Sequence, residues 1–377
     1  MIYRKFKELS LSALGMGTMR LPVVDGDNGN VDRAKVREMV AYAIKNGINY
    51  FDTAWGYHNG DSEKTMGEVL SEYPRESFCL ATKFPGYDVN NLKNKAEIFE
   101  EQLSRCKTPY FDFYLFHNLC EKNVDYYLDP QYGLLEYLLE QKKNGRIRHL
   151  GFSTHGTIET VKRFLDAYGS EMEFCQIQLN WLDYKMQNAK AKIELLREYN
   201  IPIWVMEPLR GGKLARLAPE YEEELGKVRP EASTVEWGFR YVQSIPEVVV
   251  TLSGMSNMDQ IKDNIRIFET DKPLSAEETA KLYGVANAMT SKVTLPCTAC
   301  RYCTTYCPME LDIPKIIEQY NEYTFSGGGF LAPMIIRAMP EEKRPSACIG
   351  CRSCEAVCPQ NIKISEMMSN FASKLKK

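Results

Sequence analysis

The chain has 377 residues and a formal net charge of −3, from 47 Lys and Arg against 50 Asp and Glu. This balance gives no strong field for nucleic acid or for an anionic membrane, and no apolar run is long enough to span a bilayer, so we expect neither as a partner. The start, MIYRKFKELS, lacks the apolar core of a secretory signal, which predicts a cytoplasmic protein.

Short apolar segments rich in β-forming residues recur along the first part of the chain. They are LSALGMG (11–17), NYFDTA (49–54), FCLATK (78–83), FDFYLFHN (111–118), IRHLGFST (147–154), FCQIQLN (174–180), IPIWVMEP (201–208) and EVVVTLSG (247–254). Segments with apolar residues near helical spacing lie between them, for example 31–47 and 133–145. Eight strand–helix alternations over about 250 residues predict a (β/α)8 barrel, an α/β fold. An open doubly wound sheet is the alternative, but no GxGxxG fingerprint follows any of these strands.

A barrel also predicts where chemically active side chains should lie, because such residues occupy the carboxyl ends of the strands and the loops that follow. Asp52 ends the second predicted strand and Tyr57 follows it, while Lys83 ends the third and His117 the fourth. Taken singly, each has an ordinary interpretation as a packed ring, a solvated cation or a helix cap. Four residues that can move or steer a proton on one rim favour a catalytic site.

The chemistry of these four side chains is coherent. A tyrosine has a pKa near ~10 and is a poor acid at neutral pH unless its anion is stabilised, and a buried lysine cation can do this. Asp52 would keep Lys83 charged and in place, and His117 would orient a carbonyl oxygen beside the Tyr57 hydroxyl. Tyr57 would then donate a proton while a cofactor supplies the hydride.

Motifs over about residues 1–285 resemble the aldo-keto reductase superfamily. The matching segments are FDTAWGYHNGDSEKTMGEVL, LATKF, DFYLFHN, GRIRHLGFSTH and SGMSNMDQIKDNI, in the order found in that family. The resemblance implies that Asp52, Tyr57, Lys83 and His117 are the family's catalytic tetrad. It also implies an oxidoreductase that interconverts a small carbonyl compound and an alcohol, with NADP or NAD bound over the rim.

The resemblance further assigns residues to the nucleotide. Ser153, Thr154 and Gln176 match positions that hold the nicotinamide carboxamide, and segments 207–214 and 253–256 match loops that hold the phosphates, where backbone amides suit an anion. The complete implied set is Gly17, Thr18, Asp52, Ser153, Thr154, Gln176, Met206, Glu207, Leu209, Gly254, Ser256, Gln260 and Asn264.

Two departures from the family pattern concern this nucleotide site. Met206, followed by Glu207, stands where the family often stacks an aromatic ring on the nicotinamide. Gly254 and Gln260 stand where members that prefer the phosphorylated cofactor carry cations, and losing two cations weakens a site for a 2′-phosphate. NADH therefore stays open beside NADPH.

Two cysteine runs near the end of the chain have the same spacing, C-x2-C-x2-C-x3-C-P, at 297–308 and 348–359. This is the spacing of bacterial iron–sulfur proteins with two [4Fe-4S] clusters, in which the fourth cysteine of each run serves the other cluster. The expected ligands are Cys297, Cys300, Cys303 and Cys358 for one cluster, and Cys348, Cys351, Cys354 and Cys307 for the other. Structural zinc is the alternative, but zinc sites usually combine two cysteine pairs.

The concentration of cysteine after residue 290 predicts a barrel domain over 1–289 and a mostly α-helical, ferredoxin-like domain over 290–377. From residue 290 onward the chain has 11 Lys and Arg against 8 Asp and Glu, which would suit an acidic carrier such as a ferredoxin or flavodoxin. The expected helices are 274–289, which opens with a capping box of Ser275 and Glu278, then 313–325, stopped by glycines 327–329, and 332–340.

Three roles for the clusters remain open at this point. They could exchange electrons with the active site or with a partner, or they could be structural or redox-sensing additions to a working reductase. The third interpretation is an electron-transfer protein built on a barrel that is no longer catalytic, which the intact set of four rim residues disfavours.

Overall fold

The computed structural model describes residues 1–291, 294–297 and 299–376. The chain divides into two compact units, Met1–Lys281 and Leu282–Lys377. The division falls inside helix α13 (Ala276–Ser291), which also contains the sequence-predicted boundary at residue 290. None of the helices in these residues combines the length and apolar character that crossing a membrane requires.

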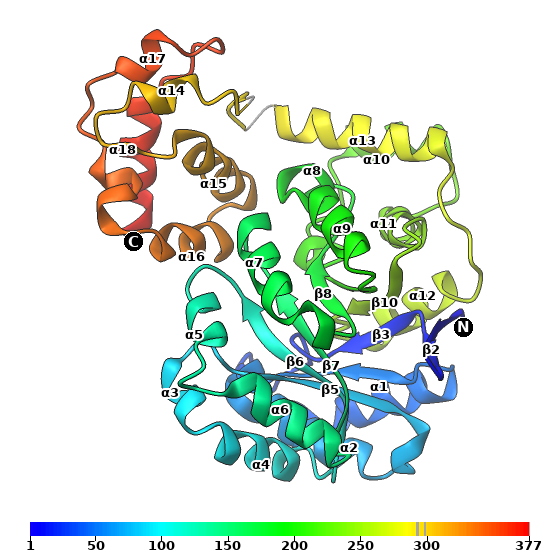
Figure 1. The fold of residues 1–377 in the computed structure, drawn as a ribbon. Helices are drawn as coiled ribbons and strands as arrows, with labels where there is room; N and C mark the ends of the chain where they lie inside the picture. Colours follow the sequence, from blue (N-terminus) through cyan, green and yellow to red (C-terminus); the bar gives the residue numbers. More distant parts are fainter. Residues whose placement is uncertain (292–293, 298, 377) are drawn as a thin grey trace. The chain divides into compact units, whose positions relative to one another are not determined.

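Eight parallel strands close into a barrel in the first unit, in the order β10-β3-β4-β5-β6-β7-β8-β9 (Figure 1). The strands are β3 (Leu14–Gly17), β4 (Tyr50–Asp52), β5 (Cys79–Phe84), β6 (Phe111–Leu119), β7 (Ile147–Thr154), β8 (Cys175–Gln178), β9 (Ile203–Met206) and β10 (Val248–Ser253). Each overlaps one of the eight predicted segments. Because β10 pairs with β3, the sheet has no free edge and the open doubly wound alternative is wrong.

Helices surround the barrel and follow the strands in turn (Figure 1). They are α1 (Arg33–Lys45), α2 (Asp61–Leu70), α3 (Val89–Lys93), α4 (Lys95–Arg105), α5 (Val124–Leu128), α6 (Leu134–Lys143), α7 (Ile158–Tyr168), α8 (Asp183–Met186), α9 (Ala189–Glu198), α10 (Pro219–Gly226), α11 (Thr234–Gln243) and α12 (Met258–Ile267). The predicted (β/α)8 barrel is confirmed.

A short antiparallel hairpin, β1 (Tyr3–Phe6) and β2 (Leu9–Ser12), precedes the barrel and was not predicted. The predicted strand at 11–17 is wrong at its start, because its first two residues belong to this hairpin. Phe6 lies inside the barrel, with its ring centroid 5.0 Å from that of Trp204 and 5.7 Å from that of Phe113. Since both partners lie near the amino ends of their strands, the hairpin covers that end of the barrel and leaves the carboxyl ends open for a site.

The second unit is helical in the residues described. Its elements are the second part of α13, then α14 (Tyr302–Thr305), α15 (Ile313–Ser326), α16 (Leu331–Ala338), α17 (Ser353–Ala356) and α18 (Ile364–Leu375). The predicted helices and stop signals are confirmed. Gly327 ends α15 in the left-handed conformation, at φ 67°. At the start of α13, the Ser275 N–H donates to Glu278 Oε2 at 2.7 Å and the Glu278 N–H donates to Ser275 Oγ at 3.2 Å.

The described residues of the two cysteine runs adopt the same backbone, 51 residues apart. Equivalent residues have matching left-handed φ angles: Ala299 (54°) and Gly350 (72°), Arg301 (65°) and Arg352 (62°), Glu310 (50°) and Asn361 (52°). Each run contains a short helix and is followed by a longer one, and the N-caps of the longer helices, Asp312 and Lys363, have nearly identical angles (φ −75°, ψ 76° and φ −75°, ψ 74°). Buried side chains of α15 and α18, including Ile313, Ile364 and Phe371, share one apolar core.

Candidate functional site

A buried ion pair lies at the carboxyl end of the barrel strands. Lys83 Nζ, on β5, donates to Asp52 Oδ1, on β4, at 2.6 Å and to the carbonyl oxygen of Thr53 at 2.8 Å. The two side chains are only 1% and 3% exposed. Burying a charge is costly unless it is paired and hydrogen-bonded, so Asp52 and Thr53 together keep the ammonium group in this position.

The other two predicted catalytic residues lie against this pair. Tyr57 opens the 3-10 helix η1 (Tyr57–Gly60), and its ring centroid is 5.0 Å from Lys83 Nζ. The His117 ring, near the end of β6, is 6.1 Å from the Tyr57 ring at 81°. His58 has φ 53°, and its Nε2 accepts a hydrogen bond from the Leu21 N–H at 3.1 Å, which fixes the turn just after Tyr57. The structure therefore brings the four residues together at one end of the barrel.

The environment assigns a protonation state to three of these groups. Burial raises the pKa of Tyr57, and the nearby Lys83 cation opposes this rise. Burial acts to lower the pKa of Lys83, but the Asp52 carboxylate outweighs it and the pKa is raised. Burial and the charge of Lys83 hold the pKa of His117 well below its usual value. At neutral pH the site thus has a protonated phenol, an ammonium cation and a neutral imidazole.

Several buried polar atoms near this rim have no hydrogen-bond partner among the described residues. Asp52 Oδ2, His117 Nδ1 and Gln176 Oε1 are the relevant ones. A buried acceptor left without a donor costs about 1–3 kcal/mol, so a ligand that brings a donor would be stabilised there. Gln176 pairs with Ser153 across β7 and β8, and its amide oxygen is a suitable acceptor for the N–H of a nicotinamide carboxamide. The residues present therefore fit that group.

The hydroxyls that sequence analysis assigned to the nucleotide divide into two kinds. Ser153 Oγ accepts a hydrogen bond from the Asn118 N–H at 2.8 Å, so its own proton is available to another acceptor. Thr154 Oγ1 donates to the Leu119 carbonyl at 2.8 Å, and Thr18 Oγ1 donates to the Asp52 carbonyl at 2.9 Å. The two threonine hydroxyls are therefore already bonded to backbone carbonyl groups, and this geometry gives no support for a direct contact of either with the nucleotide.

The remaining assigned residues lie in or near the loops after β3, β9 and β10. Gly17 and Met206 end β3 and β9. Gln260 Oε1 accepts from the Ser256 N–H at 2.7 Å, and Asn264 Nδ2 donates to Ser253 Oγ at 3.0 Å, so side chains of α12 shape the loop that contains Gly254. In the loop after β9, Glu207 has φ 53° and its carbonyl accepts from Asn180 Nδ2 at 3.0 Å, while Leu209 packs beside Gly238.

Arg20, in the loop after β3, was missed by the sequence analysis. It lies between the loop after β9, which contains Gly211, and the loop after β10, which contains Gly254. A Cβ atom at Gly211 would be 2.8 Å from Arg20 Nη2, and one at Gly254 would be 3.2 Å from Arg20 Cδ. The two glycines thus make room for the arginine, whose own carbonyl accepts from Ser256 Oγ at 2.8 Å. The signal in the sequence was a cation three residues beyond the end of a barrel strand.

A buried polar network behind Lys83 was also missed. Glu63 on α2 is fully buried, and its Oε1 accepts from Thr82 Oγ1 and from Gln102 Nε2, each at 2.7 Å. Gln102 Nε2 also donates to the Lys83 carbonyl at 3.1 Å. Arg105 Nη1 lies 3.4 Å from Glu63 Oε2, and its guanidinium stacks 3.6 Å from the Trp55 ring centroid. The network therefore joins the strand that carries Lys83 to the loop that carries Tyr57.

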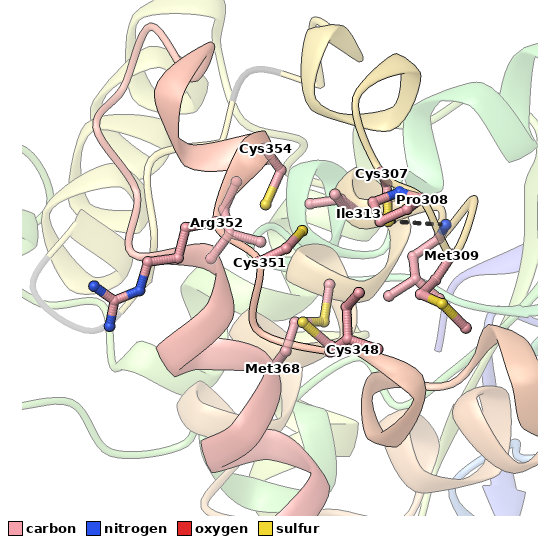
Figure 2. A pocket seen from close by; sticks show the side chains of 12 residues that line it. Cys307, Pro308, Met309, Ile313, Cys348, Cys351, Arg352, Cys354 and Met368 are labelled. Carbon is pink, nitrogen blue, oxygen red and sulfur yellow. Dashed lines mark hydrogen bonds between the residues drawn. The ribbon is translucent and has the colours of Figure 1, made fainter.

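The eight cysteines of the two runs gather around two cavities, and each cavity draws on both runs. One is lined by Cys307 with Cys348, Cys351 and Cys354, and the other by Cys358 with Cys297, Cys300 and Cys303. Figure 2 shows the cavity of Cys348, Cys351 and Cys354, here called the second cavity, with the Arg352 side chain directed away from it. The crossing of the fourth cysteine thus has the arrangement that the sequence analysis expects.

The composition of each cavity fits an iron–sulfur cluster. Each encloses about 320 Å³ of space not filled by protein atoms, including the part open to solvent, and apolar side chains such as Ile364 and Pro314 complete the lining. Thiolates are the ligands such clusters use. Among the described residues, no group of three or more His, Cys, Asp or Glu side chains is arranged to hold a single metal ion. The other four cysteines, at 79, 106, 120 and 175, are buried and form no disulfide.

Comparisons with known proteins agree with both parts of the chain. The family model described as "Aldo/keto reductase family" matches residues 13–287, and the one described as "4Fe-4S dicluster domain" matches residues 296–362. The NADH-specific methylglyoxal reductase of Escherichia coli (strain K12) is 29% identical over 224 residues, which cover 55% of this chain and 66% of the relative. The uncharacterized oxidoreductase YqkF of Bacillus subtilis (strain 168) is 25% identical over 291 residues, or 69% of this chain and 88% of the relative. Among solved structures, aldo-keto reductase AKR11C1 from Bacillus halodurans (holo form) is 28% identical with a TM-score of 0.61, over 76% of this chain and 97% of that one.

Proposed function

The chain belongs to the aldo/keto reductase family and carries a 4Fe-4S dicluster domain, and from this premise we propose that its barrel uses NADH or NADPH to interconvert a small carbonyl compound and its alcohol. The family places it among the oxidoreductases. The observation that carries the proposal is the buried set of Asp52, Tyr57, Lys83 and His117 at the open end of the barrel. Tyr57, Lys83 and His117 have the protonation states that the reaction requires.

The four side chains divide the proton chemistry among them. The Tyr57 hydroxyl donates its proton to the carbonyl oxygen as the carbon is reduced, and Lys83 stabilises the phenolate left behind. Asp52 keeps the lysine charged and fixed through the 2.6 Å hydrogen bond. His117, neutral because of burial and the adjacent cation, orients the substrate oxygen toward Tyr57. Reduced nicotinamide, when bound, supplies the hydride.

Residues of this chain would hold the nucleotide along the rim. Gln176 Oε1 and the Ser153 hydroxyl would bind the carboxamide, since both have free hydrogen-bonding capacity. Arg20, between Gly211 and Gly254, would place a cation beside the phosphates. Because Gly254 brings no cation of its own, we expect little preference for NADP(H) over NAD(H). The other residues inferred to surround the nucleotide are Gly17, Asp52, Met206, Glu207, Leu209, Gly254, Ser256, Gln260 and Asn264. Thr18 and Thr154 would instead hold the backbone of the site in place.

The two cavities of the second unit would hold [4Fe-4S] clusters with crossed ligand sets. Cys297, Cys300, Cys303 and Cys358 would form the first, and Cys348, Cys351, Cys354 and Cys307 the second. We infer that the clusters transfer electrons one at a time to or from the active site or a carrier protein such as a ferredoxin or flavodoxin. The exposure of Cys300 and Cys351 is compatible with this role, because a carrier protein must approach a cluster closely to exchange electrons with it.

Anaerobic purification followed by nucleotide oxidation assays tests the proposal. Loss of NADH and of NADPH is followed separately across a panel of aldehydes, ketones and sugars, with iron analysis of the same sample. We expect turnover with at least one carbonyl class and about eight irons per chain. A sample that binds zinc in place of iron would overturn the cluster assignment, and tight nucleotide binding with no carbonyl turnover would overturn the assignment of the barrel.

A further inference from the structure

The two cysteine runs share one backbone but present different surfaces. In the first run, Arg301 Nη2 pairs with Asp312 Oδ2 at 2.7 Å, so the cation after the second cysteine is neutralised. The equivalent residues of the second run are Arg352 and Lys363. Because the N-cap angles match, position 363 lies where Asp312 lies in the first run, and the acid that would pair with the arginine is replaced by a second cation.

The same edge of the second run exposes apolar surface and a thiol. Ile349, between the first two cysteines, is 65% exposed, and Cys351 is exposed. Ile349 and Arg352 also line the second cavity, and Figure 2 shows the arginine side chain pointing outward from it. The first run has a threonine in the position of Ile349. An exposed apolar residue beside a redox group, bordered by cations, has the composition of a small transient interface.

Two carboxylates lie near this edge, Glu366, which lines a surface hollow together with Arg352, and Glu355, which attracts Arg352 and Lys363 without forming an ion pair with either. Glu355 Oε1 accepts from the Ser365 N–H at 2.8 Å and from Ser365 Oγ at 2.6 Å, which caps the first turn of α18. Arg352 and Lys363 have no ion-pair partner among the described residues, in contrast to Arg301. The second run thus has an outward-facing cation where the equivalent residue of the first run is paired.

We propose that Ile349, Cys351, Arg352 and Lys363 form a docking edge for an acidic one-electron carrier protein, and that electrons pass between this carrier and the second cluster. The inference rests on the cluster assignment made above. One electron leaves the carrier as the cluster gains one, or the reverse, and no bond forms or breaks. The apolar centre provides the close approach, and the cations steer the encounter and make it sensitive to salt.

The test compares the two runs, which act as matched positions within one chain. Anaerobic, full-length, iron-loaded protein is titrated with an acidic two-iron ferredoxin at low and at physiological ionic strength, and its Kd is measured. Arg352→Glu is expected to raise the Kd about tenfold or more at low salt, whereas Arg301→Glu, the same change at the equivalent position, changes it by less than about threefold. Lys363→Asp rebuilds the pairing of the first run and is expected to weaken binding similarly. Ile349→Ser is expected to weaken binding at both ionic strengths.

Equal effects of Arg301→Glu and Arg352→Glu would overturn the proposal, as would absence of ferredoxin binding. A basic cytochrome c that binds as tightly as the ferredoxin would also overturn it, because the edge would then lack charge selectivity. Iron content and NADH-linked carbonyl turnover are measured on every sample. Failure of turnover with the binding pattern intact would count against the barrel assignment alone, and absence of iron would remove the cluster assignment and the docking edge together.

Discussion

Lys83 is the residue on which the proposed chemistry of the barrel depends. It is a fully buried cation that touches a carboxylate, a backbone carbonyl and the face of a phenol ring. A buried carboxylate–ammonium pair is weak evidence for stability by itself, because desolvation offsets the attraction between the charges. Its position beside Tyr57 and His117 gives it a functional explanation, since a fixed cation lowers the cost of forming the phenolate.

Replacement of Tyr57 by phenylalanine removes the proposed acid and little else. The Phe variant should bind nicotinamide nucleotide nearly as well as the wild type, because Gln176 and Ser153 are unchanged. Turnover should fall by a factor of order 10² or more, which is the contribution of a positioned general acid. Nucleotide titration and steady-state kinetics measure the two effects, and wild-type turnover from Tyr57→Phe would remove this residue from the mechanism.

The pH dependence of carbonyl reduction follows from the two shifted groups. The pKa of Tyr57 is raised, so its protonated form, which is the acid, persists to higher pH and is lost only as pH rises through that value. The pKa of His117 is depressed, so the imidazole does not become charged near its ordinary value of about 6.5. A profile of kcat should therefore be level from about pH 6 to 9 and decline above about 10. An inflection near 6.5 that vanishes in His117→Gln would show that the histidine titrates and contradict this account.

At the scale of elements, the catalytic rim depends on contacts made outside the barrel. Glu63 on α2 receives hydrogen bonds from β5 and α4 and faces Arg105, which stacks on Trp55 in the loop before Tyr57. The sequence places Lys83 at the end of one strand and Tyr57 in the loop after another. It gives no sign of this support, since a glutamate in the first turn of a helix ordinarily indicates only a favourable helix dipole. The partners come from three elements and meet only when the barrel closes.

Glu63→Gln tests the role of this network. The amide keeps the size of the side chain but cannot accept all the hydrogen bonds that the carboxylate accepts, and it removes the charge facing Arg105. We expect a loss of about 1–3 kcal/mol in unfolding free energy and lower turnover with nucleotide affinity unchanged. Glu101→Gln is the matched control, since Glu101 also pairs with Arg105, at 2.8 Å, but is 48% exposed, so its loss should cost at most about 1 kcal/mol. Equal effects of the two substitutions on turnover would contradict a positioning role for Glu63.

The cysteine runs differ from the Glu63 network, because the spacing of the cysteines in the sequence is enough to predict which of them lie together. The cysteine spacing repeats after 51 residues. Two apolar positions repeat with it, since Leu311 corresponds to Ile362 and Ile313 corresponds to Ile364. The backbone repeats as well, down to the left-handed residues. The hairpin β1–β2 was missed because its residues give only a short, partly charged pattern, which tertiary packing of Phe6 and Leu11 turns into structure.

Cys307→Ser tests the crossing of the fourth ligand. Cys307 lines the cavity of the second run, so its loss should damage that cluster and leave the cluster of its own run largely intact. Cys358→Ser is the matched control and should show the reverse. Electron paramagnetic resonance of anaerobic, reduced samples distinguishes the two clusters, provided their spectra are first assigned with Cys300→Ser and Cys351→Ser. Loss of the first-run cluster in Cys307→Ser would contradict the crossing.

At the scale of the whole molecule, the chain combines two units with separate apolar cores, and the electron carriers proposed for the two units differ. A hydride delivers two electrons together, whereas each cluster accepts one. In the proposed reaction, a nicotinamide and the four rim residues are sufficient to reduce a carbonyl, and the clusters are not required for this step. The central claim is therefore that hydride passes directly from nicotinamide to a carbonyl carbon beside Tyr57.

Transfer of deuterium from NADH labelled at nicotinamide C4 tests this claim most directly. Anaerobic, iron-loaded protein is incubated with the label, on the transferred face, and with a carbonyl compound that the assay panel has identified as a substrate, and the alcohol is analysed by mass spectrometry. The account predicts one deuterium on the former carbonyl carbon for the wild type and little labelled product for Tyr57→Phe. Alcohol formed at the wild-type rate without deuterium would show that the electrons reach the carbonyl by another route, with the hydrogen taken from solvent, and would contradict the account.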